Sequence, residues 1–298
     1  MALDELRDFF SIALLTATLR MTTPLVFAAM GGLLSERAGV MNIALEGFML
    51  IGAFSAAAGA HYTGSAYLGL LLGAAAAAVA AAVHAFWCVT LRGDQIVAGT
   101  AINLLGLGLP AFLLQRLFGT AGRSPTVDKL PSLVGGLNVL VPAAFLTVLA
   151  VHYLLHSTKP GLRVMAAGEH PQAAESVGIN VARYRYAAVL ASGVLAGIGG
   201  AFLSIGDLSL FTTGMTNGRG FIALAAMIFG NWTPLGTLGA AVLFGAAQAT
   251  QLQAQATGLP INKELIIALP YLLTLVAITG LVRHSRPPAG LGRHPTAH

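Results

Sequence analysis

Residues 47–91 read GFMLIGAFSAAAGAHYTGSAYLGLLLGAAAAAVAAAVHAFWCVTL, 45 residues without a single Asp, Glu, Lys or Arg. A helix rises about 1.5 Å per residue, so about 20 apolar residues cross the ~30 Å hydrocarbon core of a membrane. This stretch is therefore long enough for two crossings. It lacks the polar and apolar alternation of a membrane β-barrel, and irregular backbone cannot face lipid. The stretch predicts two membrane-spanning helices.

The rest of the chain has the same character. Of its 298 residues, 56% are hydrophobic and 9% are charged, and the mean hydropathy is +0.78. Ordinary soluble domains carry about 25% charged residues, so a soluble globular protein is excluded. We predict an all-α, polytopic integral membrane helix bundle with roughly eight to ten transmembrane helices in one domain, 1–298. The expected spans are 9–33, 43–60, 66–90, 97–118, 138–156, 187–206, 214–230, 234–251 and 264–281.

Positive charge indicates how the chain is oriented, because Lys and Arg accumulate in cytoplasmic loops. The connection 157–186 and the tail after residue 282 should both be cytoplasmic, and four expected spans lie between them. Counting backwards places 119–137 and the acidic amino terminus outside, although Arg123 and Lys129 in that outer loop count against the scheme. The basic residues used here are Lys159, Arg163, Arg183 and Arg185 in the connection, and Arg283, Arg286 and Arg293 in the tail.

The sequence lacks features that several other kinds of protein need. The net charge of +5 is spread along the chain without a basic run, so no nucleic-acid partner is expected. Acidic residues occupy the start of the chain, so the first apolar stretch is expected to be a retained span and not a signal peptide. The single Cys88 excludes an intramolecular disulfide and any zinc site built on two cysteines.

Catalytic motifs are also missing. The three lysines, Lys129, Lys159 and Lys263, do not follow a glycine, so a P-loop for ATP is absent. No Gly-x-Ser-x-Gly or His-Glu-x-x-His pattern occurs. His152 and His156 share a helix face but have no carboxylate nearby, which favours a polar interfacial role over a metal site. We therefore expect no enzyme, no metal and no bound cofactor.

Two pairs of glycines recur at four-residue spacing, Gly69 with Gly73 and Gly193 with Gly197. Small residues at this spacing let helices approach closely. The alternative is that Gly and Ala are simply abundant in this chain.

The stretch 31–47, GGLLSERAGVMNIALEG, places charged and amide side chains between apolar segments. A charge at mid-membrane costs about 2.5 to 3.5 kcal/mol on insertion scales, so such residues pair or line a wet cavity. Glu36 and Arg37 are expected in a loop as solvated charges. Glu46 lies one turn beyond Asn42 on the same helix face, which indicates a place in or beside a polar path.

The stretch 161–180, GLRVMAAGEHPQAAESVGIN, predicts a short helix within the cytoplasmic connection. Pro171 suits the first helical position and Gly178 the residue after a helix end. Such a helix could enter a groove on a partner protein, or it could be a structured connector. One side is expected to carry the small apolar residues Ala173, Ala174 and Val177.

The stretch 218–236, GRGFIALAAMIFGNWTPLG, predicts a broken helix near Asn231 and Trp232, because Pro234 suits the first turn of a new helix. Broken helices in membranes expose backbone groups that protein or a water-filled path must satisfy. Asn103, Asn231 and Gln248 could contact a polar solute. Hydrogen bonding between helices is the alternative and is favoured for any one of them.

Three segments of the chain resemble the permease subunits of bacterial ABC importers. They are Ser35 to Gly52, Gly161 to Asn180 with its continuation Ser192 to Gly197, and Gly218 to Gly236. That family serves branched-chain amino acids, ribose-type sugars and nucleosides. The pattern Ser-Glu-Arg-x-Gly-Val-x-Asn-Ile-x-Leu-Glu-Gly is most similar to the second permease of its nucleoside and simple-sugar branch.

The resemblance implies an ATP-driven importer of a nucleoside or simple sugar in the bacterial cytoplasmic membrane. ATP would be used by separate ATPase subunits, a sister permease would pair with this chain within the lipid, and an extracytoplasmic binding protein would deliver the solute. The residues expected to couple to the ATPase are Glu169, Ala173, Ala174, Glu175 and Gly178. Those expected along the solute path are Asn42, Glu46, Asn103, Asn231, Trp232 and Gln248.

A second class of transporter remains open. An intramembrane carboxylate is a functional candidate by default, so Glu46 could couple solute to protons in a secondary transporter. Transport that depends on an ATPase and persists in Glu46→Gln would favour the importer.

Overall fold

The computed structural model describes residues 12–133, 136–256 and 286–293, and these are the residues discussed below. Among these residues, helices make up nearly all of the regular secondary structure. They are α2 (Ile12–Arg37), α3 (Leu45–Thr63), α4 (Ala66–Ala85), the π-helical turn η1 (Phe86–Thr90), α5 (Gln95–Phe118), α6 (Leu140–Ser157), α7 (Lys159–Glu169), α8 (Pro171–Ser176), α9 (Val181–Ala201), the π-helical turn η2 (Phe202–Leu208), α10 (Arg219–Phe229) and α11 (Pro234–Ala256).

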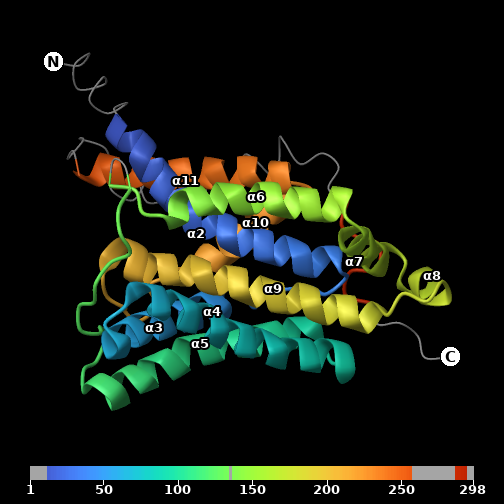
Figure 1. Ribbon diagram of the computed structural model, residues 1–298, viewed down its shortest axis with the longest axis horizontal. Helices are drawn as coiled ribbons and strands as arrows, with labels where there is room; N and C mark the ends of the chain where they lie inside the picture. The colour runs from blue at the N-terminus through green and yellow to red at the C-terminus, as the bar shows by residue number, and fades with distance from the viewer. Residues whose placement is uncertain (1–11, 134–135, 257–285, 294–298) are drawn as a thin grey trace.

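The long helices lie side by side along the longest axis of the molecule (Figure 1). Six of them are long and apolar enough to cross a membrane, which confirms a polytopic all-α membrane bundle. They are Ile12–Arg37, Ala66–Thr90, Gln95–Phe118, Leu140–Ser157, Val181–Leu208 and Pro234–Gln255. The expected span 264–281 lies outside the described residues.

Two expected boundaries were wrong. Helix α2 runs on to Arg37, so Glu36 and Arg37 end the helix and do not lie in a loop. Helix α10 has only 11 residues, whereas the sequence predicted a span from 214. The chain before it turns through Gly214, Asn217 and Gly218, which all have positive φ and cannot continue a right-handed helix.

Close contacts between backbones build the centre of the bundle, where α2, α3, α4 and α9 pack together. A Cβ added at Gly73 would lie 2.7 Å from the Gly52 carbonyl oxygen, and one at Gly197 would lie 2.5 Å from the Ala77 Cβ. Both separations are shorter than van der Waals contact, so a side chain would push the helices apart. The predicted role of the small-residue pairs is therefore confirmed.

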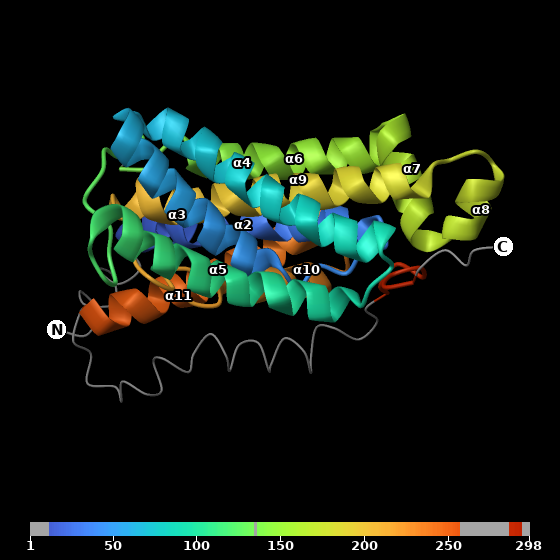
Figure 2. The same ribbon diagram turned by 90° about the horizontal axis from the view of Figure 1, so that it is seen from below.

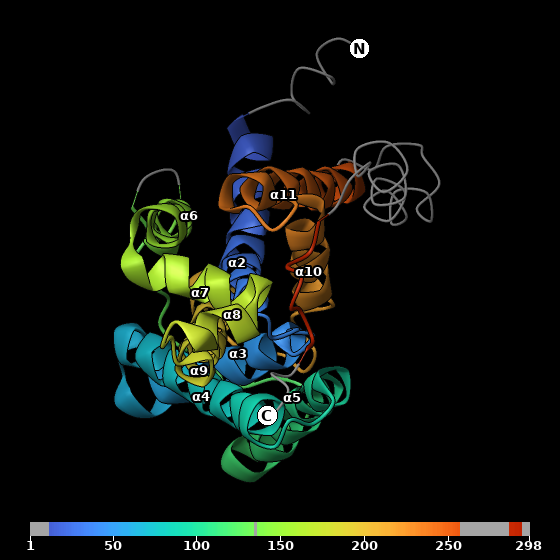
Figure 3. The same cartoon turned by 90° about the vertical axis from the view of Figure 1, so that its right-hand side faces the viewer.

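The two ends of the bundle differ. Helices α7 and α8 project at one end, and residues 119–133 and 136–139 lie at the other (Figures 1 and 2). Residues 286–293 lie at the α7 end, where they pass beside α7 and α10 (Figure 3). The connection 157–186 and the described part of the tail are thus on the same side, as the charge pattern predicted.

Large apolar side chains cover the outside of the bundle. Leu71 on α4, Leu104 on α5 and Leu146 on α6 are each more than 60% exposed. Such surfaces suit a lipid environment and not water. Arg20, which interrupts the first span, is compensated by an ion pair with Asp207 of η2.

Candidate functional site

Helix α10 is a short helix whose first turn is held by a buried carboxylate. Glu46, in the first turn of α3, accepts hydrogen bonds from the backbone N–H groups of Gly218 at 2.8 Å and Gly220 at 2.6 Å. The Thr216 hydroxyl donates to the same carboxylate at 2.5 Å. The first N–H groups of a helix have no partner within the helix, and a negative charge there is stabilised by the helix dipole. Glu46 therefore caps α10 from a neighbouring helix.

Glycine is required where this cap meets α10. A Cβ at Gly220 would lie 2.5 Å from the Glu46 Cα, so the two backbones can approach only because residue 220 has no side chain. Arg219 strengthens the same turn, since its guanidinium donates to the carbonyls of Met215 and Thr216 at 3.2 Å each.

The other end of α10 is the predicted break. Asn231 and Trp232 have φ of 52° and 51°, and left-handed backbone costs about 1–2 kcal/mol for each residue other than glycine. Two side chains from α2 hold this conformation. The Trp232 ring N–H donates to Glu36 Oε2 at 2.6 Å, and Arg37 Nε donates to the Trp232 carbonyl at 2.7 Å.

The amides of Asn42 and Asn103 are engaged between helices. Asn42 donates to the Ser192 hydroxyl on α9 at 2.7 Å. Asn103 donates to the Ile43 carbonyl at 2.9 Å and accepts from the Gly47 N–H at 2.8 Å. The helix-to-helix bonding that the sequence offered as the alternative is thus present for both, and contact with a solute remains a prediction.

The expected path residues form two groups and one outlier. Asn42, Glu46 and Asn103 lie around the start of α3, and Asn231 and Trp232 form the break between α10 and α11. Gln248 is half-buried on α11, and among the described residues no hydrogen bond joins it to the other five.

The predicted short helix at the α7 end exists as α8. Pro171 is its first residue, and Gly178 follows it with a φ of +82°. Ala174 is buried against Ala167 and Val181, while its neighbour Ala173 is exposed. The expectation that Ala173, Ala174 and Val177 share one side of the helix was wrong, because Ala174 faces the bundle whereas Ala173 and Val177 are exposed.

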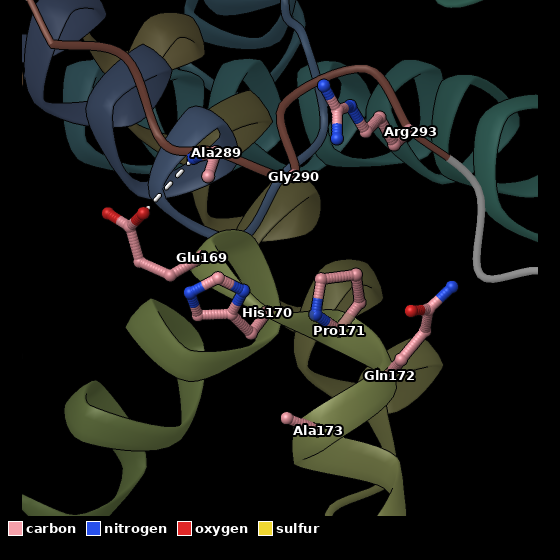
Figure 4. A pocket seen from close by; sticks show the side chains of 8 residues that line it. All are labelled: Glu169, His170, Pro171, Gln172, Ala173, Ala289, Gly290 and Arg293. Atoms are coloured by element: carbon pink, nitrogen blue, oxygen red, sulfur yellow. Dashed lines mark hydrogen bonds between the residues drawn. The ribbon is translucent and has the colours of Figure 1, made fainter.

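A surface hollow of about 580 Å³ lies between α7, α8 and residues 286–293 (Figure 4). At its edge, Glu169 Oε2 accepts from the Ala289 N–H at 3.1 Å, and Oε1 lies 3.6 Å from an Arg37 nitrogen. This carboxylate is therefore engaged within the molecule. The residues around the hollow are Glu169, His170, Pro171, Gln172, Ala173, Ala289, Gly290 and Arg293.

Glu36, Arg37 and Ser192 belong to this arrangement although they were not expected as site residues. The sequence alone does not identify Glu36 as a site residue, because the Trp232 that binds its carboxylate is 196 residues away.

The structure also bears on a metal site at His152 and His156, whose two rings lie 4.6 Å apart. In the ranges that the structure describes, no three His, Cys, Asp or Glu side chains gather as a metal site would need.

The fold and these contacts define a polytopic membrane protein with a discontinuous helix, an arrangement found in transporters. Residues 14–278 match the family described as the branched-chain amino acid transport system permease component, and the chain belongs to that family. Proteins of this family are subunits of transport systems and not enzymes.

Similar proteins are ABC transporter permeases. The chain is 37% identical to the guanosine permease NupQ of Bacillus subtilis, over 93% of this chain and 94% of NupQ. It is 38% identical to the nucleoside permease NupC of Lactococcus lactis, over 86% and 88%, and 34% identical to the putative glucose permease TsgC13 of Haloferax volcanii, over 91% and 92%. No solved structure matches the chain.

Proposed function

We propose that this chain forms the membrane path for a nucleoside or a simple sugar in an ATP-driven importer. The names of the similar proteins support both solute classes, with two nucleoside permeases and one putative glucose permease among them. The observation that carries the proposal is α10, a helix of 11 residues that begins at the Glu46 cap and ends at a strained break beside the α7 end.

The partners occupy different surfaces. ATPase subunits dock on α8, where Ala173, Glu175 and Gly178 are exposed. The binding protein delivers solute at the opposite end, and a sister permease and lipid cover the apolar flanks. The α7 end faces the cytoplasm of a bacterial cytoplasmic membrane, because the basic connection 157–186 and residues 286–293 of the tail, with Arg286 and Arg293, lie there together.

Transport then follows from a two-state motion. When ATP closes the ATPases, the docked α8 moves and the permease changes from an inward to an outward opening. The polar residues at the two ends of α10 line the route in this proposal and bind solute weakly, because tight binding would slow its release. ATP is consumed by the separate ATPase subunits, so this chain holds no cofactor.

The proton-coupled alternative has no support from the similar proteins. Within this conformation, the Glu46 carboxylate is occupied by three hydrogen-bond donors from residues 216, 218 and 220. That arrangement gives the carboxylate a capping role, which needs no proton transfer.

Uptake measurements test the proposal. Cells carrying this permease with its neighbouring transport genes are given labelled adenosine, ribose or leucine, before and after deletion of the ATPase gene. We expect uptake of adenosine or ribose that disappears with the ATPase. Uptake that survives the deletion and collapses with a protonophore would reject the importer and restore the proton-coupled alternative.

A further inference from the structure

Residues 286–293, here called the strap, are bound to four separate parts of the molecule. The Gly290 N–H donates to the Gly168 carbonyl of α7 at 2.8 Å, and the Gly292 N–H donates to the Gly39 carbonyl, after α2, at 3.1 Å. The Arg293 carbonyl accepts from Arg185 of α9 at 3.0 Å. The Arg286 N–H donates to the Asn231 side chain at 2.8 Å. The strap therefore connects α7 to the break at the end of α10.

Glycines allow this close fit. A Cβ at Gly290 would lie 2.7 Å from the Gly168 carbonyl oxygen, and a Cβ at Gly168 would lie 3.0 Å from the Gly39 nitrogen. Three backbone segments thus touch directly at one point. A displacement of α7 cannot be absorbed by side chains there and must move the strap or the end of α2.

A second route joins the same two places through side chains. Glu169, the last residue of α7, lies 3.6 Å from Arg37, and Arg37 also donates to the Trp232 carbonyl in the break. The same carboxylate accepts the Ala289 N–H of the strap. The contacts form a closed ring that runs from Glu169 to Arg37, to the break, to the strap and back to Glu169.

We propose that the strap and the Arg37–Glu169 pair transmit movement of the ATPase-docking segment to the C-terminal end of α10. The inference rests on the proposed function, since it assumes that ATPase subunits dock on α8. Glu169 and Arg37 act as positioning residues, because their contacts within the chain join α7, the strap and the break to one another.

The asymmetry of α10 supports this assignment. Its first turn is bound to α3 through Glu46, whose contacts involve no residue of α7, α8 or the strap. The break that follows its last turn is bound to α2 and the strap. A motion that starts at α8 therefore reaches the break first.

The test uses the complete transporter in proteoliposomes, with the ATPase subunits, the sister permease and the binding protein, and labelled guanosine and ribose as probes. One variant ends at residue 285 and lacks the strap, and its control ends at residue 293. A second variant is Glu169→Gln, and its control is Asp128→Asn, which removes an exposed carboxylate at the opposite end of the bundle, outside the ring. The measured quantity is the amount of solute transported per ATP hydrolysed.

We expect the chain that ends at residue 285 to hydrolyse ATP but to transport about tenfold less solute per ATP, and Glu169→Gln to lose about threefold. Both controls should stay within twofold of the unmodified transporter. Ratios in both variants that match their controls would overturn the inference. If the shortened chain does not assemble, Glu169→Gln decides the question by itself.

Failure of the proposed function would look different. If the unmodified complex takes up neither guanosine nor ribose when ATP is supplied, the proposed function fails before any variant is compared. A complex that transports normally, and continues to do so in both variants, rejects only the transmission through the strap and Glu169.

Discussion

The two ends of α10 are held in different ways. At the first turn, one carboxylate on α3 binds two backbone N–H groups and a hydroxyl, all within residues 216–220. At the break that follows the last turn, Glu36 and Arg37 bind the ring and the carbonyl of Trp232, and the contacts continue to α7 and the strap.

This difference assigns the ends different roles. The first turn is fixed to the centre of the bundle by a compact cap that reaches nothing else. The second end is connected to the surface on which we propose that the ATPase subunits dock, and its backbone is already strained at Asn231 and Trp232. Strained backbone that is held by several contacts is typical of a part that changes conformation.

The largest expected effect comes from removing the cap. Glu46→Ala leaves three donors without a partner, and each unpaired buried donor costs about 1–3 kcal/mol. We expect a loss of several kcal/mol, visible as a lower unfolding temperature in detergent, together with loss of uptake. Glu46→Gln keeps an acceptor and should recover part of both. A Glu46→Ala permease with normal stability would show that the cap does not hold α10.

Trp232→Phe removes a contact at the other end of α10, and its effect on stability should be smaller than that of Glu46→Ala. It removes the ring N–H that binds Glu36 and leaves a buried carboxylate without that partner, at a cost of about 2 kcal/mol. Uptake should fall about tenfold, because one route to the break is lost. Trp87→Phe is the matched control, since Trp87 is 48% exposed on the outside of the bundle. Equal effects of the two substitutions would contradict a special role for the break.

Ala173→Arg and Ala174→Arg separate docking from folding. Ala173 is exposed, so the first substitution should leave the unfolding temperature unchanged and reduce the binding of ATPase subunits during co-purification. Ala174 is 4% exposed, and burying an unpaired charge there should destabilise α8 by about 3 kcal/mol or more. Normal ATPase binding by a well-folded Ala173→Arg chain would exclude α8 as the docking helix.

The smallest expected effect concerns one hydrogen bond of the break. Asn231→Asp keeps a side-chain oxygen for the Arg286 N–H, whereas Asn231→Gly removes it while relieving the left-handed strain. Stability should therefore change by less than about 1 kcal/mol in both. The ratio of solute to ATP should fall about twofold in Asn231→Gly alone. If the two variants behave alike, the Asn231 contact has no part in transmission.

Local features of the chain predicted much of this architecture. Uncharged runs predicted the positions of the long helices, Pro234 marked the start of α11, and Gly178 marked the turn with positive φ that follows α8 and Val177. These signals are local, because helix length, a missing amide hydrogen and a positive φ depend on the residue and its neighbours.

The remaining features depend on contacts between distant residues. Glu36 looked like a solvated loop charge because its partner Trp232 is far along the chain. Glu46 was recognised as unusual, but its capping role required the position of α10. The burial of Ala174 instead of Ala173 required knowing on which side of α8 the bundle lies.

Distances between spin labels in the assembled transporter, with and without ATP, test the difference between the two ends of α10 most directly. One pair, at Val97 and Leu235, reports on the break, and the other, at Leu104 and Phe221, reports on the capped end; all four side chains are exposed. With buried Cys88 replaced by Ala, we predict that ATP changes the first distance by about 2 Å or more and leaves the second within about 1 Å. Equal changes in both distances, or a change at the capped end alone, would contradict the account.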